Sequence, residues 1–269
     1  METISDRSPP IPPVPPIPPV PLSYSTRTSE PFISAHSFAT WAVALLWVGV
    51  AMSAVAIVSD AAQARLLQEI AAGAAIDGEE AIANDRRQTA VNVLDLATLA
   101  VTAVFFLLWL RRAYRNLRPL GARNLAYSPG WAVGAWFVPI LNLFRPYQIV
   151  RETWARSDPF APPDAEPQAP PLLAWWWGLW LARGFISRLS TQMSAASDDA
   201  DRLLAATWLA MVGSLVSIAA AVLLIRIIRA IDAAQAQKSR LPETAGVPSA
   251  PFVAPPMTAH AGVAMPDEL

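Results

Sequence analysis

Two charged side chains are the most deeply placed charges in the apolar stretches of this 269-residue sequence. Asp95 is the only charge in residues 91–110, and Arg183 lies eleven residues past Leu172 in residues 172–189, which also contain Arg188. A charge within a bilayer is costly, so such groups usually face other protein and meet a partner of opposite sign. We therefore predict an intramembrane Asp95–Arg183 pair that forms a structural bridge, or two side chains that extend to the outer interface. The alternative is that the two charges serve an ion or proton path.

Tryptophan and arginine gather in the middle of the chain. Indole rings favour the headgroup level of a bilayer, and guanidinium groups attract anionic lipid headgroups. The expected headgroup contacts are Arg111, Arg112, Arg115, Arg118, Trp131, Trp136, Trp175 and Trp176. One alternative for the rings is a cage around a quaternary ammonium ligand. Plain topological anchoring would explain the same residues without any selective lipid.

The residues needed for a catalytic site are not found together. The sequence has no cysteine, and its two histidines, His36 and His260, are far apart. It has no glycine-rich phosphate loop, and paired carboxylates occur only in polar loops and tails. A net charge of −1 gives no basic face for nucleic acid. We expect neither enzymatic activity nor a cofactor, metal ion or nucleic-acid partner.

Four apolar blocks carry these residues, and each has the length of a membrane-spanning helix. Twenty residues at about 1.5 Å each cover a hydrocarbon core of roughly 30 Å. Backbone polar groups in lipid must be satisfied within their own segment, which favours helices. The blocks are residues 38–58, 91–110, 172–189 and 203–225. The sequence therefore predicts an all-α membrane protein whose four spans form two hairpins, with residues 59–90 extending the first two helices beyond the membrane. Small residues four apart, Gly49 with Ser53 and Gly213 with Ser217, predict close helix contacts.

A fifth apolar stretch, residues 131–144, follows the helix-start pattern Ser128, Pro129 and Gly130. Its fourteen residues would make a helix of only about 21 Å. Pro139 and Pro146 are expected to interrupt that helix. We predict an interfacial or re-entrant segment that returns to the side it left. The alternative is a proline-kinked fifth span over residues 131–150.

The distribution of basic residues distinguishes these two arrangements. With four spans, fourteen basic residues lie on the side of the two tails: two in the first tail, eight between the second and third blocks, and four after the last. The other side has Arg65, Arg86, Arg87 and Arg202. With five spans the distribution becomes eight against nine. Because lysine and arginine are enriched in cytoplasmic loops, we predict four spans in the cytoplasmic membrane with both tails in the cytoplasm.

The two ends of the chain are rich in proline. Residues 1–35 include a segment from Pro9 to Pro21 in which nine of thirteen residues are proline, which favours polyproline II. We predict two disordered tails, residues 1–35 and 237–269, around a helical membrane domain at residues 36–236. The first tail could dock a cytoplasmic protein partner with a proline-binding module. The alternative is a solvated tail without a partner.

The middle of the chain resembles a known family. The segments that carry the resemblance are WLRRAYRNL at 109–117, SPGWAVGAWFVPILNLFRPYQIV at 128–150 and LLAWWWGLW at 172–180. They are similar to the bacterial integral-membrane family catalogued as domain of unknown function 4328, which has the same arginine–asparagine helix end, proline-containing aromatic segment and tryptophan-rich helix. The resemblance covers roughly residues 95–230. It implies a multi-span bacterial membrane protein and transfers no activity.

Two classes of function fit these observations. The first is a non-catalytic membrane component that organises partners or lipids. The alternative is a small transporter or channel subunit, which would act as an oligomer because four helices alone leave little room for a path. The lipid bilayer is the partner expected in both cases.

Overall fold

The computed structural model of the chain describes residues 31–75, 77–161, 168–196 and 199–241. These residues form helices and no strand, which confirms the predicted all-α class. The elements are α1 (His36–Ala71), α2 (Gly78–Arg115), α3 (Trp131–Gly134), η1 (Leu141–Leu143), α4 (Arg145–Ser157), α5 (Pro171–Ala195) and α6 (Ala200–Lys238). The proline run and the predicted tail after residue 241 lie outside the described residues.

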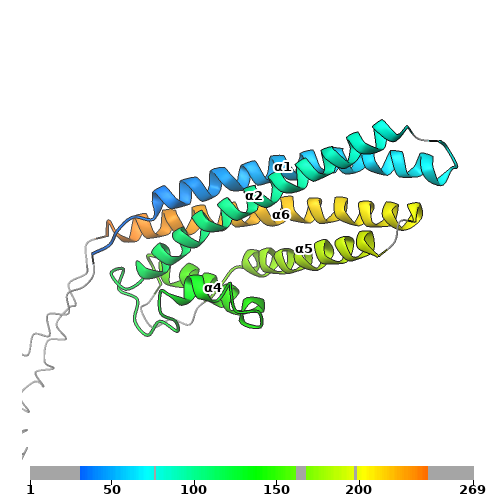
Figure 1. The fold of residues 1–269 in the computed structure, drawn as a ribbon. Helices are drawn as coiled ribbons and strands as arrows, with labels where there is room; N and C mark the ends of the chain where they lie inside the picture. Colours follow the sequence, from blue (N-terminus) through cyan, green and yellow to red (C-terminus); the bar gives the residue numbers. More distant parts are fainter. Residues whose placement is uncertain (1–30, 76, 162–167, 197–198, 242–269) are drawn as a thin grey trace, which may run out of the picture.

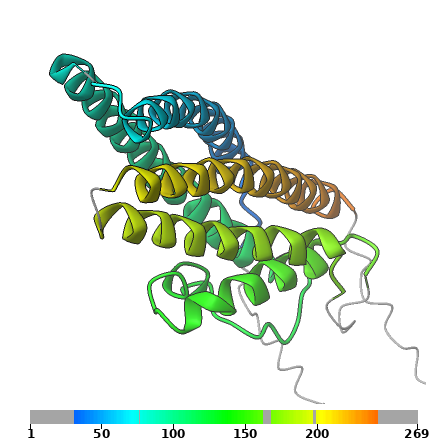
Figure 2. The same cartoon turned by 90° about the vertical axis from the view of Figure 1, so that its right-hand side faces the viewer.

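Four long helices run alongside one another in alternating directions (Figure 1). The start of α1 and the end of α6 lie at one end of the bundle, which we call the tail end, and α4 lies toward that end (Figures 1 and 2). Helix α1 packs against α2 and α6, and α6 packs against α5. By contrast, α2 and α5 are not packed against each other. The bundle is therefore an arc in the order α2, α1, α6, α5, with its open side between α2 and α5.

Three of the described helices are long and apolar enough to cross a membrane: α1, α2 and α6. Large apolar side chains such as Val58 and Leu96 are exposed on them, which is consistent with contact with a lipid bilayer. Helix α1 has 36 residues, about 54 Å at 1.5 Å per residue, and α2 is of similar length. Both exceed a hydrocarbon core, so the prediction that residues 59–90 extend the first two helices is confirmed.

The segment between α2 and α5 does not form one continuous helix. A helix begins at Trp131, directly after the predicted start signal, but it ends at Gly134. Pro139, which has no backbone N–H, lies between this turn and η1. Pro146 occupies the first turn of α4, where a missing N–H costs no hydrogen bond. The prediction that Pro146 interrupts a helix is therefore wrong, because this proline begins one.

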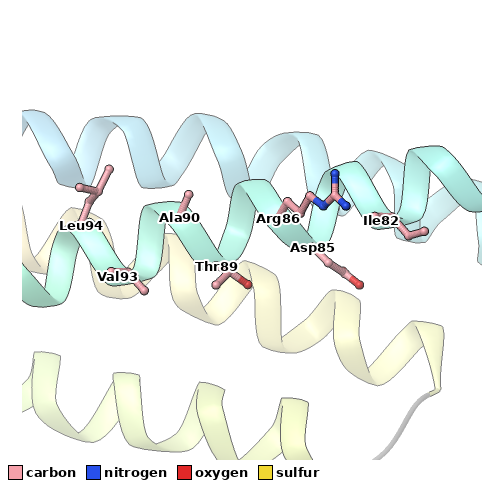
Figure 3. A pocket seen from close by; sticks show the side chains of 7 residues that line it. All are labelled: Ile82, Asp85, Arg86, Thr89, Ala90, Val93 and Leu94. Carbon is pink, nitrogen blue, oxygen red and sulfur yellow. The ribbon is translucent and has the colours of Figure 1, made fainter.

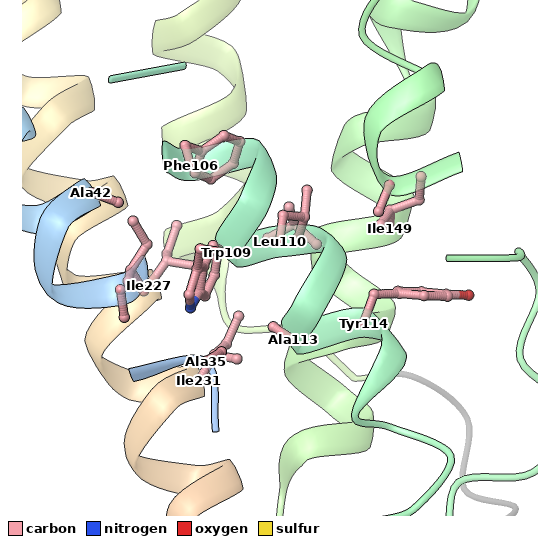
Figure 4. Packing of buried hydrophobic residues seen from close by; sticks show 14 of the residues in the cluster. Ala35, Ala42, Phe106, Trp109, Leu110, Ala113, Tyr114, Ile149, Ile227 and Ile231 are labelled. Carbon is pink, nitrogen blue, oxygen red and sulfur yellow. The ribbon is translucent and has the colours of Figure 1, made fainter. Parts of the chain in front are cut away.

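The buried core is concentrated at the tail end (Figure 4). Trp109, Leu110 and Tyr114 of α2 are fully buried there, against Ile149 of α4 and Ile227 of α6. Side chains farther along the bundle are more exposed, and a large share of them are apolar. The chain thus combines a close-packed core at one end with long helices that expose apolar surface.

Candidate functional site

A cavity of about 370 Å³ lies between α1, α2, α5 and α6. This volume falls in the range of about 300–1,000 Å³ that is typical of small-molecule sites. The segment before α4 contributes Trp136 and Phe137 to its lining. Most of the wall is apolar, and the polar lining residues are Ser53, Asp95, Thr98, Thr102, Arg183 and Ser217. An apolar cavity with a few convergent polar groups is the usual form of a ligand site.

The cavity exists because the arc of helices does not close between α2 and α5.

The two glycines expected at close helix contacts differ in their surroundings. Gly213 allows α6 to approach α5 closely, since a Cβ atom there would come within 3.0 Å of Ile186 Cγ2. This bears out the predicted close helix contact at Gly213. At Gly49 of α1 the opposite holds, because a Cβ atom there would meet nothing within 4 Å. Gly49 lines the cavity instead of forming a tight contact.

The structure brings Asp95 and Arg183 together inside this cavity. Arg183 Nη2 lies 3.9 Å from Asp95 Oδ2, which is a charge contact but is too long for a hydrogen bond. Arg183 Nε donates to Ser217 Oγ at 2.7 Å, and Ser217 Oγ donates to the Gly213 carbonyl at 2.8 Å. The Arg183 and Asp95 side chains are 29% and 38% exposed. The pair therefore joins α5 to α2 across the open side of the arc and remains accessible from the cavity.

A double-mutant cycle should measure this contact. We expect Asp95→Asn and Arg183→Gln each to lower the free energy of unfolding, and the double variant to lose less than the sum of the two by about 0.5–1 kcal/mol. The measurement is chemical unfolding in mixed micelles. Asp95→Asn combined with Arg188→Gln is the control and should be additive. Additive losses in the Asp95–Arg183 cycle as well would mean that the two charges do not interact.

Aromatic rings close the cavity at its tail end. Trp136 packs edge-on against Phe106 at 5.5 Å and against Trp180 at 5.3 Å between ring centroids. Trp177 stacks on Trp180 at 4.8 Å and donates from Nε1 to the Leu143 carbonyl at 3.0 Å. These contacts hold the irregular segment before α4 against α2 and α5. We call Phe106, Trp136, Trp176 and Trp180 the aromatic floor, because all four line the cavity.

Only part of the predicted headgroup set faces outward. Arg111, Arg115 and Arg118 are exposed, and Arg112 is half-buried. Among the rings, Trp175 is 69% exposed and Trp131 is exposed at the surface, where the Arg145 guanidinium lies 4.7 Å from its ring centroid. Trp136 and Trp176 belong to the aromatic floor, and Trp176 is only 1% exposed. The tryptophans therefore divide into a surface group and a group that builds the cavity.

A buried carboxylate at the tail end is a feature that sequence reasoning missed. Glu152 of α4 is 5% exposed. Its Oε2 accepts from the Tyr114 hydroxyl at 2.6 Å, and its Oε1 accepts from the Ala126 N–H at 2.8 Å. The Tyr114 oxygen also accepts from the Tyr127 N–H at 3.0 Å. These bonds fasten the loop after α2 to α4. The available signal was the spacing of Glu152 relative to Ile149 and Val150, which places it beside the buried face of an amphipathic helix.

A second buried group joins three parts of the chain. The Asn116 side chain bonds both backbone groups of Ile33: Nδ2 donates to the carbonyl at 2.9 Å, and Oδ1 accepts from the N–H at 3.4 Å. Gln235 Nε2 of α6 donates to the Ala113 carbonyl at 2.9 Å and to Ser157 Oγ at 3.0 Å. Asn116 Nδ2 also lies 3.3 Å from Gln235 Oε1. The group satisfies buried polar atoms and acts as a structural fastening.

A hollow on the part of α2 far from the tail end is less suited to a ligand (Figure 3). It is wide open and is lined from one helix alone, by Ile82, Asp85, Arg86, Thr89, Ala90, Val93 and Leu94. Several elements must contribute polar groups to hold a small molecule in a fixed position, and this surface has one element only. Within the described ranges, no three His, Asp or Glu side chains come together in a group that could hold a metal ion.

Comparison with curated proteins and with solved structures gives no match. A family model described as a domain of unknown function, DUF4328, matches residues 72–233. The match covers more than half of the chain, from the start of α2 to near the end of α6, and includes Asp95, Glu152 and Arg183. It confirms the resemblance noted from the segments at 109–117, 128–150 and 172–180. The chain therefore belongs to this family of domains of unknown function.

Proposed function

We propose that this protein is a non-catalytic membrane component that binds a lipid-soluble molecule in the cavity between its helices. In this proposal α1, α2, α5 and α6 all cross the membrane, and both tails lie in the cytoplasm. Helix α5 has 25 residues, about 37 Å at 1.5 Å per residue, and packs along α6. The fourteen-to-four distribution of basic residues, which exists only with four spans, supports the orientation.

The position of the cavity carries the proposal. Its lining residues on α2, from Asp95 to Leu107, all fall within the apolar block 91–110. The cavity is therefore at membrane depth, and the unpacked side of the arc between α2 and α5 faces lipid. A molecule dissolved in the bilayer could enter sideways without crossing a polar layer. Apolar walls disfavour an aqueous solute in the same space.

A second candidate is a small transporter, and one observation favours it. Asp95 and Arg183 are charged, lie within the cavity and are both accessible from it. Ionisable groups at membrane depth often mark a transport path. Flux in reconstituted vesicles that is lost in Asp95→Asn would support this candidate. Lipid-soluble ligand binding without any flux would support the first.

Filling the cavity should weaken binding of the lipid-soluble molecule. We expect Gly49→Phe to reduce saturable quenching of tryptophan fluorescence by 1-bromododecane in lipid nanodiscs by about tenfold, because the ring would occupy the space where the chain lies. Gly184→Phe is the matched control: a Cβ atom there also meets nothing within 4 Å, but Gly184 does not line the cavity. Both changes remove a helical glycine, so helix propensity changes equally. Equal quenching in the two variants would contradict binding in this cavity.

A further inference from the structure

We propose that the ligand is an uncharged amphiphile with a hydroxyl end, oriented with that end between Asp95 and Arg183 and with its chain on the aromatic floor. This inference rests on the proposed function and specifies the chemistry of the bound molecule. Four observations carry it: the polarity of the two ends of the cavity, the charge balance at the polar end, the depth of that end, and the volume.

The two ends of the cavity differ in chemistry. Asp95, Arg183 and Ser217 meet at one end, and Phe106, with Trp136 packed on it, closes the other. The aromatic floor lies between Phe106 and this polar end, because Trp180 is only three residues from Arg183 on α5. Asp95 and Phe106 are eleven residues apart on the same helix, about 16 Å at 1.5 Å per residue. A long molecule with one polar end has only one favourable orientation in such a space.

The negative charge of Asp95 and the positive charge of Arg183 at the polar end of the cavity compensate each other, but the two side chains are not hydrogen-bonded to one another. Asp95 Oδ2 and Arg183 Nη2 are 3.9 Å apart, so a small group could bond to both. A hydroxyl donates to a carboxylate and accepts from a guanidinium, whereas a charged head would be repelled by one of the two. The nearby hydroxyls do not compete, because Thr98, Thr102 and Ser217 each donate to a carbonyl of their own helix, at 2.8, 2.6 and 2.8 Å.

The depth of Asp95 in the membrane and the volume of the cavity limit the class of ligand further. Asp95 is the fifth residue of the apolar block 91–110, so a head bound there lies about 6 Å inside the hydrocarbon region. Drawing a phosphate to that depth costs far more than drawing in a hydroxyl that finds two partners. At about 30 Å³ for a group of the size of water or methylene, 370 Å³ holds roughly a dozen such groups. A single chain of about twelve carbons fits.

Three probes with the same alkyl chain and different polar end groups test which end group the cavity prefers. They are 12-bromododecan-1-ol, 12-bromododecanoate and 12-bromododecylammonium, added to the full-length protein in nanodiscs of zwitterionic lipid. In the expected orientation the bromine reaches the part of the aromatic floor beside Phe106 and quenches Trp136 and Trp176. We expect the wild-type protein to bind the alcohol about tenfold more tightly than either charged probe. Equal affinities for the three probes would overturn the inference, and no variant is needed for that result.

Charge variants provide a second measurement. Asp95→Asn leaves the cation alone and should move the preference to the carboxylate, while Arg183→Gln should move it to the ammonium, each by about tenfold. The double variant should prefer the alcohol again, and Arg188→Gln should behave as wild type. The same order of probes in every variant would overturn the assignment of the head. If no probe quenches saturably, or if Gly49→Phe has no effect, the proposed function itself fails.

Discussion

Replacing Glu152 with alanine is expected to lower the free energy of unfolding by about 2–4 kcal/mol, because the buried Tyr114 hydroxyl and the backbone N–H of the exposed Ala126 lose their acceptor. The donors are the Tyr114 hydroxyl, at 2.6 Å, and the Ala126 N–H, at 2.8 Å. Alanine also leaves a gap beside Ile149 and Val150, both of which are fully buried. The measurement is chemical unfolding in mixed micelles followed by tryptophan fluorescence.

Glu152→Gln is the matched control for this change. Its amide oxygen still accepts from one of the two donors and its volume is nearly the same, so we expect less than half of the loss. Hydrogen exchange gives a local measurement: the Ala126 amide should exchange faster in Glu152→Ala than in wild type. If the alanine variant unfolds at the same denaturant concentration as wild type, Glu152 does not fasten α4 to the loop after α2.

The second large expected effect concerns membrane topology: an introduced cysteine is either labelled from outside the cell or not labelled at all. The natural sequence has no cysteine, so an introduced thiol is unique. Ser157 follows residues 131–150, the alternative fifth span, but it is fully buried, and its hydroxyl donates to the Thr153 carbonyl. A thiol at this position would therefore stay unlabelled on either side of the membrane. Phe160 is 79% exposed and is the better position. In intact cells we expect an impermeant maleimide to label Ala75→Cys and to leave Phe160→Cys unlabelled.

Permeabilised cells supply the control, because Phe160→Cys should then react as fully as Ala75→Cys. The expectation rests on the position of α4, which packs against α6 and lies toward the tail end, where α1 starts and α6 ends (Figure 1). Labelling of residue 160 from outside would place α4 on the opposite side from the tails. That result would favour the five-span alternative and contradict the proposed orientation.

The long helices could be predicted from the sequence because a bilayer imposes a simple rule of length and polarity. The blocks at 38–58, 91–110, 172–189 and 203–225 each lie inside an observed helix. The helices extend beyond the blocks, and in α6 the last residues bury Ile227, Ile231 and Gln235 against the tail-end core. That extension depends on packing between distant segments, for which hydropathy gives no signal.

The irregular segment was predicted in character but not in detail. Short length and Pro139 indicated that residues 131–144 are not a full span, and the structure divides this stretch into α3, η1 and connecting residues. From the sequence alone Pro146 indicates a second break, although proline is also favoured in a first helical turn, which is where the structure has it. A proline that breaks a helix and a proline that starts one look the same in the sequence. They differ only in whether the preceding helical turn has already ended.

The candidate site was predicted only in part. Asp95 and Arg183 were paired from their position in apolar blocks, and they do meet. The cavity around them depends on α2 and α5 remaining apart, which is a property of how three helix pairs pack rather than of any one helix. Residue type alone places Trp136 and Trp176 at the membrane interface, because a ring that lines a cavity and a ring in an aromatic belt have the same sequence signature.

The amide of Asn116 has a mechanical consequence. By bonding the N–H and the carbonyl of Ile33, it fixes the chain three residues before α1 begins. A pull on the preceding residues is therefore carried first by the end of α2, and by Gln235 of α6, before it reaches α1. Force on the residues before Ile33 therefore passes through Asn116 to the close-packed tail end of the bundle and does not act along the axis of α1.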